Sequence, residues 1–128
     1  MQRTNIRTGA VWEDKVGYSR AVRMGNQIEV SGTVAVQNGK VVSPGDAYGQ
    51  TKRILEIIKN SLEQLGGKLS DVIRTRIYVT DINVWEKVGK AHGECFIKNR
   101  PCTSMVEVRK LIGTDYLVEI EATAIVSP

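Results

Sequence analysis

The stretch that most constrains the fold is residues 100–125, because it places two carboxylates inside a strongly apolar pattern. Its sequence, RPCTSMVEVRKLIGTDYLVEIEATAI, predicts a strand, a tight connection and a second strand that pair as a hairpin. In the second strand Glu119 and Glu121 share one face with Leu117 and Thr123, and small aliphatic residues fill the other face. Burying an unpaired carboxylate is costly, so the glutamate face requires a specific explanation.

Several earlier stretches also have strand patterns. SRAVRMG and QIEVSGTVAV flank the pair Gly25-Asn26, a hairpin signal, and Gly32 in the second run indicates a bulge or a close backbone approach. A second turn at Asn38-Gly39 precedes a short KVV strand, and residues 1–16 are expected to form a short strand followed by a loop. In DVIRTRIYVT two alternating faces are predicted, with Ile73, Thr75, Ile77 and Val79 on one and Arg74, Arg76 and Tyr78 on the other.

Two helices are expected between these strands. The first runs from about Asp46 to Leu65, has an apolar stripe at helical spacing and ends at Gly66-Gly67. The second begins near Asp81, and the Asn99-Arg100-Pro101 sequence ends it. Its stripe is formed by Trp85, Val88, His92, Cys95 and Phe96.

The resulting order, β-β-β-α-β-α-β-β, predicts a single α+β domain of two layers over residues 1–128, with both helices on one face of a mixed sheet. The other face would then be uncovered in a monomer and would expose Leu117, Met105 and Tyr78 to water. We therefore expect other subunits to cover this face. Its predicted members are Arg74, Arg76, Tyr78, Met105, Glu119, Glu121 and Thr123.

Composition excludes several classes of protein. No apolar run is long enough for a membrane helix, and no secretory signal is visible at the start of the chain. The two cysteines are expected to be free thiols in a reducing cytoplasm, and one histidine with two cysteines gives a poor basis for a zinc site, so neither metal nor cofactor is expected. The net charge of +4 comes from dispersed Lys and Arg residues, which argues against nucleic-acid binding.

Glu119 is the strongest candidate for chemistry, as a general acid/base or as an acceptor that orients a water molecule. The alternative is an ion pair with Arg74 or Arg76 on the same face. Tyr18 and Trp12 could line a pocket or pack in the core. His92 is expected to be a partly buried core histidine, and nothing in the sequence indicates a reactive thiol at Cys95 or Cys102.

Three segments together resemble the Rid (YjgF) family of reactive-intermediate, enamine/imine deaminases. They are GYSRAVRMGNQIEVSG, DVIRTRIYVTDIN and the RPCTSMVEVRKLI…LVEIEATA ending, and the resemblance covers nearly the whole chain. It implies a chorismate mutase-like fold and a homotrimer with small-molecule pockets at its subunit interfaces. It also implies that Tyr18 lines the pocket and that Glu119 positions the attacking water.

Two positions depart from the family pattern. The family's deaminases bind the substrate carboxylate with an arginine two residues after the proline, where this chain has Thr103, and the cysteine often found two positions later is Met105. A single neutral hydroxyl binds a carboxylate more weakly than a guanidinium does, so standard 2-imino acid deaminase activity is doubtful. Arg20, Arg76 or Arg100 could replace the missing cation, or the pocket could take a different ligand.

The sequence therefore leaves three functional hypotheses open. The first is a hydrolase acting on an imine, an enamine or a related reactive metabolite, which could carry a carboxylate. The second is a non-catalytic, ligand-binding or regulatory trimer. The third, least favoured because of the lone His92 and the scattered basic residues, is an endoribonuclease or translation inhibitor.

Overall fold

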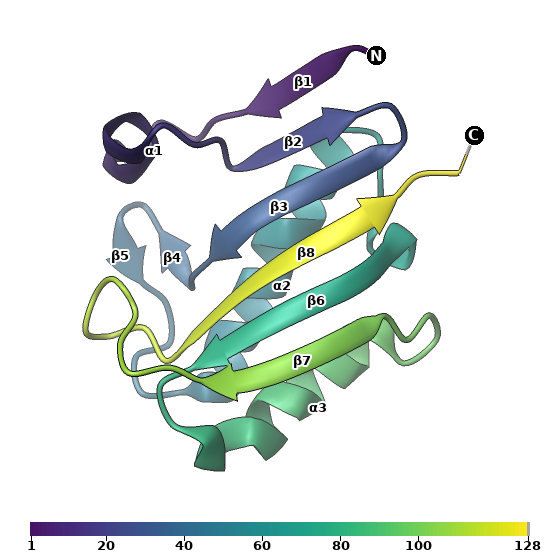
Figure 1. The fold of residues 1–128 in the computed structure, drawn as a ribbon. Coiled ribbons are helices and arrows are strands. Elements are labelled where there is room, and N and C mark those ends of the chain that lie inside the picture. The colour runs from purple at the N-terminus through teal and green to yellow at the C-terminus, as the bar shows by residue number, and fades with distance from the viewer. Residues whose placement is uncertain (128) are drawn as a thin grey trace.

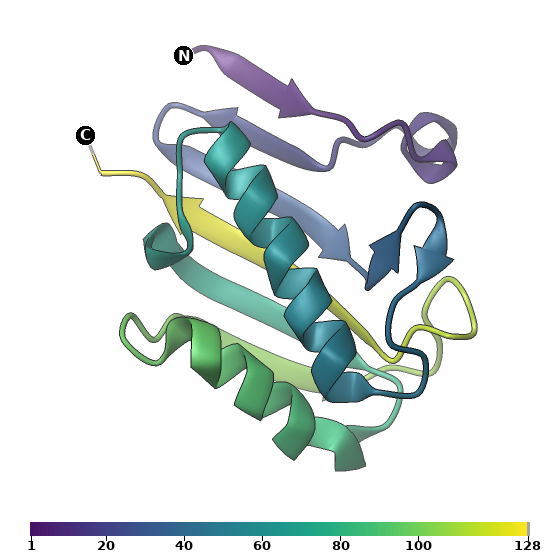
Figure 2. The ribbon, with the colours of Figure 1, turned by 180° about the vertical axis from the view of Figure 1, so that it is seen from behind.

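The computed structural model describes residues 1–127 and shows two layers, a six-stranded sheet with two long helices packed on one of its faces (Figures 1 and 2). The strands are β1 (Arg3–Ile6), β2 (Ala21–Met24), β3 (Gln27–Thr33), β6 (Val72–Val79), β7 (Cys102–Glu107) and β8 (Val118–Ile125). Their order in the sheet is β1-β2-β3-β8-β6-β7. The predicted α+β, two-layer architecture with a mixed sheet is confirmed.

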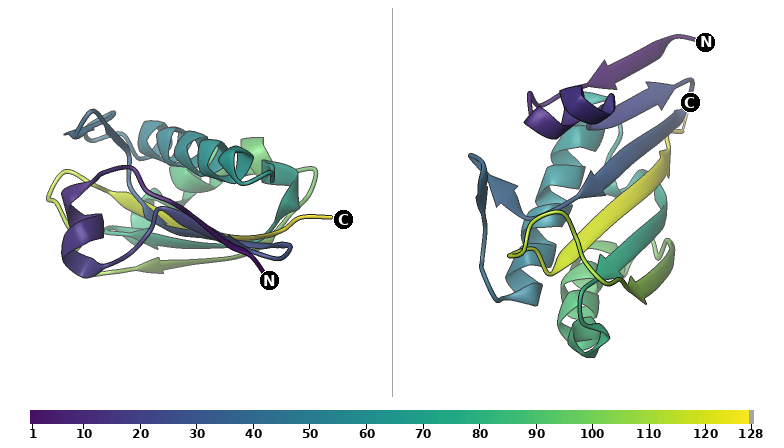
Figure 3. Two further views of the ribbon diagram at one scale, coloured as in Figure 1. Left: turned by 90° about the horizontal axis from the view of Figure 1, so that it is seen from above. Right: turned by 60° about the vertical axis from the view of Figure 1, so that its left-hand side comes forward.

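The two long helices are α2 (Ala47–Gln64) and α3 (Trp85–Phe96), which lie side by side on one face of the sheet, in front of it in Figure 2. Asp46 caps α2, since its carboxylate accepts a hydrogen bond from the Gly49 amide at 3.0 Å. The apolar stripe of α2 packs on the aliphatic face of β3 and β8, where Ile54, Ile58 and Ile120 are fully buried. Viewed from above, the opposite face of the sheet carries no long helix (Figure 3).

Several smaller elements complete the chain. The segment between β1 and β2 contains a short helix, α1 (Val11–Val16), where the sequence had predicted only a loop. The strands β4 (Val36–Gln37) and β5 (Lys40–Val41) form a two-stranded hairpin, and the 3-10 turns η1 (Leu69–Asp71) and η2 (Ile82–Val84) lead into β6 and α3. None of the helices within residues 1–127 combines the length and the apolar character that crossing a bilayer requires.

The closing segment differs from the predicted hairpin. β7 pairs with β6 in parallel at the edge of the sheet, whereas β8 lies between β3 and β6 and is antiparallel to both. The β6-α3-β7 segment is a crossover unit, because a helix is long enough to return the chain for a parallel pairing. β7 and β8 are therefore separated by β6, and the predicted direct pairing between them is wrong.

This parallel pairing also reverses the predicted orientation of β7. In the observed register Thr75 pairs with Thr103 and Ile77 pairs with Met105, so both β7 residues face the helix layer. Met105 and Leu117 pack against the core rather than lying on the uncovered face. A second correction concerns Ile73, which is 50 % exposed because the β6–β8 register shifts between Val72 and Arg74.

Candidate functional site

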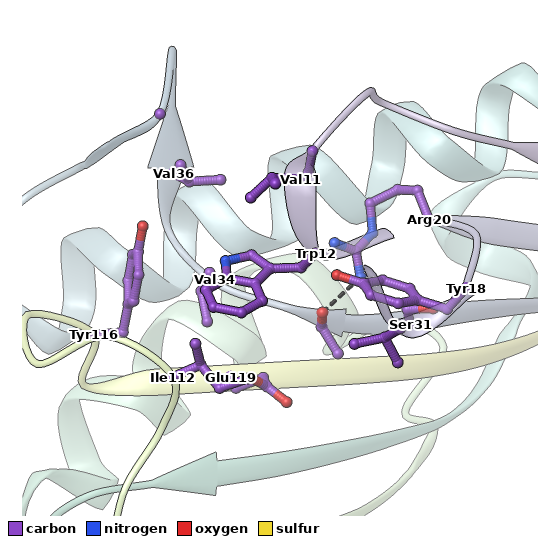
Figure 4. A pocket seen from close by; sticks show the side chains of 14 residues that line it. Val11, Trp12, Tyr18, Arg20, Ser31, Val34, Val36, Ile112, Tyr116 and Glu119 are labelled. Carbon is purple, nitrogen blue, oxygen red and sulfur yellow. Dashed lines mark hydrogen bonds between the residues drawn. The ribbon is translucent and has the colours of Figure 1, made fainter. Parts of the chain in front are cut away.

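A pocket of about 580 Å³ opens beside the end of β3, where α1, the β4–β5 hairpin and the loop before β8 come together (Figure 4). In Figure 4, Arg20, Tyr18 and Ser31 lie at one end, Tyr116 and Val36 lie at the other, and Trp12 is between them. Segments far apart in the sequence thus form one concave surface. Its lining consists of Ala10, Val11, Trp12, Val16, Tyr18, Arg20, Ser31, Gly32, Val34, Val36, Gly39, Ile112, Tyr116 and Glu119.

Glu119 reaches this pocket from β8, on the sheet face that carries no long helix. Burial raises the pKa of Glu119, the positive charge of Arg20 lowers it, and the negative charge of Glu121 raises it further. Its carboxylate lies against the backbone of Gly32, so closely that a side chain at position 32 would collide with it. The predicted close approach and bulge at Gly32 are both confirmed, since the β3–β8 register shifts between Val30 and Thr33.

Glu119 is not part of the ion pair that the sequence offered as an alternative. That pair forms at Glu121, whose carboxylate lies 3.5 Å from Nη1 of Arg76 and accepts a hydrogen bond from the Tyr78 hydroxyl at 3.1 Å. Within residues 1–127, no cationic side chain lies within 4.0 Å of the Glu119 carboxylate. Its proton affinity is therefore tuned by burial and by more distant charges, which suits a group that exchanges protons.

Arg20 is the cation of the pocket. Its Nη2 donates a 2.5 Å hydrogen bond to the carbonyl of Gly32, while its Nε is buried and has no hydrogen-bond partner among residues 1–127. The guanidinium lies 6.0 Å from the centre of the Tyr18 ring. Burial lowers the pKa of Arg20, and the charges of Tyr18, Glu13 and Glu119 oppose that shift. A guanidinium stays protonated in proteins, so a positive charge is held inside the pocket.

The N-terminal segment is anchored by hydrogen bonds that place Trp12 at the pocket. Glu13, which is buried, accepts hydrogen bonds from the amide of Thr8 at 3.0 Å and from its hydroxyl. The hydroxyl of Ser31 donates to the carbonyl of Ser19 at 2.7 Å. The Glu13 bonds order the turn that leads into α1, and the Ser31 bond ties the segment between α1 and β2 to β3, so the short, exposed helix has a defined position.

Three of the predicted site residues, Glu119, Tyr18 and Trp12, therefore line one pocket. The other two, Thr103 and Met105, lie on the opposite face of the sheet in the same chain. Thr103 sits on the edge strand β7 and is exposed, so its hydroxyl is accessible at the rim of the sheet. One chain alone does not bring Thr103 and Glu119 together.

Thr103 belongs instead to a hydrogen-bonded chain with Thr75 and His92. Oγ1 of Thr75 lies 2.8 Å from Oγ1 of Thr103 and 2.9 Å from Nε2 of His92, whose ring stacks at 4.6 Å on Phe96. Burial lowers the pKa of His92, which favours the neutral ring. The expectation of a partly buried, hydrogen-bonded core histidine is confirmed, and His92 lies outside the pocket.

The structure separates the three candidate replacement cations. Arg76 is paired with Glu121 outside the pocket, and Arg100, at the end of α3, donates from its Nε to the carbonyl of Ile97 at 3.0 Å. Only Arg20 of these three lines the pocket with Glu119. Residues 1–127 contain no group of three or more His, Cys, Asp and Glu side chains that could hold a metal ion.

Ile112 and Tyr116 are among the pocket residues that sequence reasoning missed. Both lie in the connection to β8, where there is no strand periodicity to indicate which way a side chain points. The available signal was an isoleucine in a turn-rich connection, because loops lie on the surface and carry function. In the structure the Ile112 side chain is 67 % exposed.

Comparison with known proteins identifies relatives along the whole chain. Residues 11–126 match the model of the family described as Endoribonuclease L-PSP. A RutC family protein from Pyrococcus abyssi is 38 % identical over 109 residues, with 84 % of each chain covered. The 3-aminoacrylate deaminase RutC of Acinetobacter baylyi is 36 % identical over 108 residues, covering 84 % of this chain and 85 % of that protein.

Solved structures agree with these sequence relatives. A member of the YjgF/YER057c/UK114 family from Mycobacterium tuberculosis superposes with a TM-score of 0.89 at 48 % identity, covering 98 % of this chain and all of that one. The YjgF gene product of E. coli gives a TM-score of 0.80 at 30 % identity, covering 94 % and 93 %. With the fold, the order of elements and the sequence match in agreement, this chain belongs to the Endoribonuclease L-PSP family, the family of the YjgF and RutC proteins.

Proposed function

We propose that this protein is a homotrimeric hydrolase that acts on an imine or enamine in pockets at its subunit interfaces. The observation that carries the proposal is the presence of Arg20 and Glu119 in one pocket. A buried cation can hold an anionic substrate group, and a carboxyl whose pKa is raised by burial can exchange a proton with a water molecule. The name of the A. baylyi relative, a 3-aminoacrylate deaminase, agrees with this reaction class.

In the proposed reaction the Glu119 carboxylate orients a water molecule and takes a proton from it. The water oxygen bonds to the imine carbon, and the proton is delivered to the nitrogen, which gives a carbinolamine. The C–N bond then breaks, ammonia leaves and a carbonyl forms, so water supplies every added atom and no oxidant or reductant is needed. Arg20 holds the substrate carboxylate through charge-assisted hydrogen bonds.

A trimer would explain the position of Thr103. Glu119 and Thr103 lie on opposite faces of one sheet, so a neighbouring chain would have to bring the edge of its β7 to the pocket. The uncovered face carries Tyr78 and two partly exposed aliphatic side chains, Ile73 and Val106, at 50 % and 46 % exposure. Covering such side chains favours assembly. Light scattering should report a trimer, and a stable monomer would contradict this part of the proposal.

Arg20→Gln tests whether Arg20 holds the substrate in the pocket. Arg76→Gln is the matched control, because Arg76 lies on the same open face of the sheet. We expect kcat/KM for imine hydrolysis to fall by roughly 10²-fold in Arg20→Gln, the worth of one to two charge-assisted hydrogen bonds. Most of the loss should appear in KM. Arg76→Gln should leave kcat/KM within about twofold, because Arg76 pairs with Glu121 outside the pocket. Equal losses in the two variants would refute a role for Arg20 in holding substrate.

The second candidate function is a ligand-binding trimer without turnover, favoured by Thr103 at the position of the family's substrate arginine. Calorimetric binding of a 2-oxo acid together with no imine hydrolysis would support it over the hydrolase. An endoribonuclease is disfavoured, because the single histidine, His92, is bonded to Thr75 in the helix layer, away from the pocket. We place the protein in a reducing cytoplasm, since Cys95 and Cys102 are both free thiols.

A further inference from the structure

The pocket is far more apolar than the proposed chemistry requires. Arg20 and Glu119 provide the charged groups, and Tyr18 and Ser31 add hydroxyls, all contributed by the β2–β3 region and β8. The remaining walls are chiefly aliphatic and aromatic side chains from α1, the end of β3, the β4–β5 hairpin and the loop before β8. They are Val11, Trp12, Val16, Val34, Val36, Ile112 and Tyr116.

The apolar walls are also exposed to solvent. Val11 is 57 % exposed, Trp12 47 %, Val16 70 % and Ile112 67 %, although all four line the same concave surface. Soluble proteins rarely gather large apolar side chains around a cavity unless a ligand or partner covers them. The Glu13 carboxylate orders the turn before α1 through Thr8, and Ser31 ties the segment after α1 to β3, so the wall has ordered chain on both sides.

The geometry points to a ligand with two ends. A cavity of about 580 Å³ is within the range for ligands of drug size, and it exceeds what a three-carbon imino acid could fill. The cation lies at one end, with Tyr116 and Val36 at the other (Figure 4). A substrate whose carboxylate reaches Arg20 would therefore direct its side chain along Trp12 toward Ile112 and Tyr116.

We propose that the site selects 2-imino acids and the matching 2-oxo acids with a large aryl or branched alkyl substituent over those with a methyl group. This rests on the proposed function for the placement of the carboxylate at Arg20, whereas the preference itself rests on the apolar walls. Burying an aryl or isobutyl group against them removes apolar surface from water that a methyl group cannot reach. We expect a preference of at least about 30-fold, within the range that hydrophobic pockets achieve.

Binding and turnover are measured separately on the full-length protein. Binding uses calorimetric titration with phenylpyruvate, 4-methyl-2-oxopentanoate and pyruvate. A Trp85→Phe variant makes Trp12 the only tryptophan, because the chain has two and Trp85 lies on α3 outside the pocket. Phenylpyruvate should quench or shift the Trp12 fluorescence at concentrations where pyruvate does not. Turnover uses imines released from phenylalanine, leucine and alanine by an amino-acid oxidase.

Ile112→Asn tests the wall, and Ile97→Asn is its control, since Ile97 is 56 % exposed and does not line the pocket. Both residues are exposed, so neither change should unfold the chain. We expect Ile112→Asn to reduce the preference for phenylpyruvate over pyruvate by at least about fivefold, as expected for losing part of an apolar contact. Ile97→Asn should leave the preference unchanged.

The outcomes separate this inference from the proposed reaction. A preference for phenylpyruvate with no hydrolysis of any imine would refute the reaction and support the inference. Hydrolysis that is equal for all three imines, or fastest for the alanine-derived one, would refute the inference alone. Binding of none of the three oxo acids also overturns it. The inference is also overturned if Ile112→Asn changes the oligomeric state but leaves the relative affinities for the three oxo acids unchanged. The wall would then be an interface between copies of the chain.

Discussion

Gly32→Ala should disable the site while leaving the fold intact. An added Cβ at position 32 would lie 2.9 Å from Cδ of Glu119 and 3.3 Å from its Cγ, whereas ordinary contacts begin at 3.4 Å. The carboxyl carbon must therefore retreat by about 0.5 Å, and the nearer oxygen must move further. A displacement on the order of 1 Å at a reacting group costs about 10²-fold in rate.

The stability cost should be small by comparison. The colliding atoms are the end of a flexible side chain, and the backbone of Gly32 is not in the left-handed region that favours glycine. Alanine also reduces the entropy of the unfolded chain. We expect the melting temperature to stay within about 4 °C of the wild-type value, while kcat/KM for imine hydrolysis falls by about 10²-fold.

Two comparisons make this prediction decisive. Gly89→Ala adds a Cβ in α3 where nothing lies within 4 Å, so it should leave kcat/KM unchanged and raise the melting temperature slightly. In a Glu119→Ala background, Gly32→Ala should cause no further loss, because the displaced carboxylate is already gone. If the two losses instead multiply, Gly32 acts by another route and the steric argument is wrong.

Three further changes test the electrostatics and the hydrogen bonds. Glu119→Gln should raise the free energy of unfolding at pH 7, because burial raises the pKa of Glu119 and the folded chain disfavours its ionised form. In urea melts the gain in stability should disappear below about pH 4, where the carboxyl is protonated in the folded and unfolded states. A gain that grows on acidification would contradict the direction of this shift. Thr103→Arg should speed hydrolysis of 2-iminobutyrate if a neighbouring chain brings position 103 to the pocket. The lost hydrogen bond to Thr75 should cost about 1 kcal/mol of stability. No gain in rate would indicate a pocket rebuilt for another ligand. Thr75→Val should lower the free energy of unfolding, measured by chemical denaturation, by about 1–3 kcal/mol, because it leaves His92 and Thr103 without their shared hydrogen-bond partner. Its control, Thr123→Val on the exposed face, should lower it by less than about 1 kcal/mol.

Local patterns were sufficient to predict most of the fold. Alternation identified both faces of β8 correctly from Val118 to Ile125, which are buried and partly exposed in strict turn, and failed only at Leu117, just before the strand. The Gly25-Asn26 pair correctly predicted the β2–β3 hairpin, in which Met24 pairs with Gln27. Asp46 marked the start of α2. Each of these features is set by residues close together in the chain.

The errors concern information that is not local. Alternation correctly grouped Thr103 with Met105, but it could not show which face they would join, because that depends on the pairing partner of β7. A strand, a helix and a strand in succession favour a parallel pair, and this signal at β6-α3-β7 would have corrected the predicted hairpin. Ile73 was misplaced by a register shift that no periodicity reveals.

The site was predictable only in part, for a similar reason. Glu119, Tyr18 and Trp12 were identified as candidates, yet their meeting in one pocket depends on how the segment after α1 is held against β3. Arg20 was one of three possible cations, and only the structure distinguishes it from Arg76 and Arg100. The apolar character of the pocket was invisible in the sequence because its walls come from four separate segments.

Because Glu119 and Thr103 lie on opposite faces of the sheet, a cleft that uses both must take them from two chains. Chains damaged at only one of these positions should then complement each other. Hybrid oligomers refolded from Glu119→Gln and Thr103→Val chains would contain some clefts with both residues intact, although neither parent has any. Recovery of turnover on mixing would reveal a shared cleft without a structure of the assembly, and a mixture no more active than its parents would show that each chain works alone.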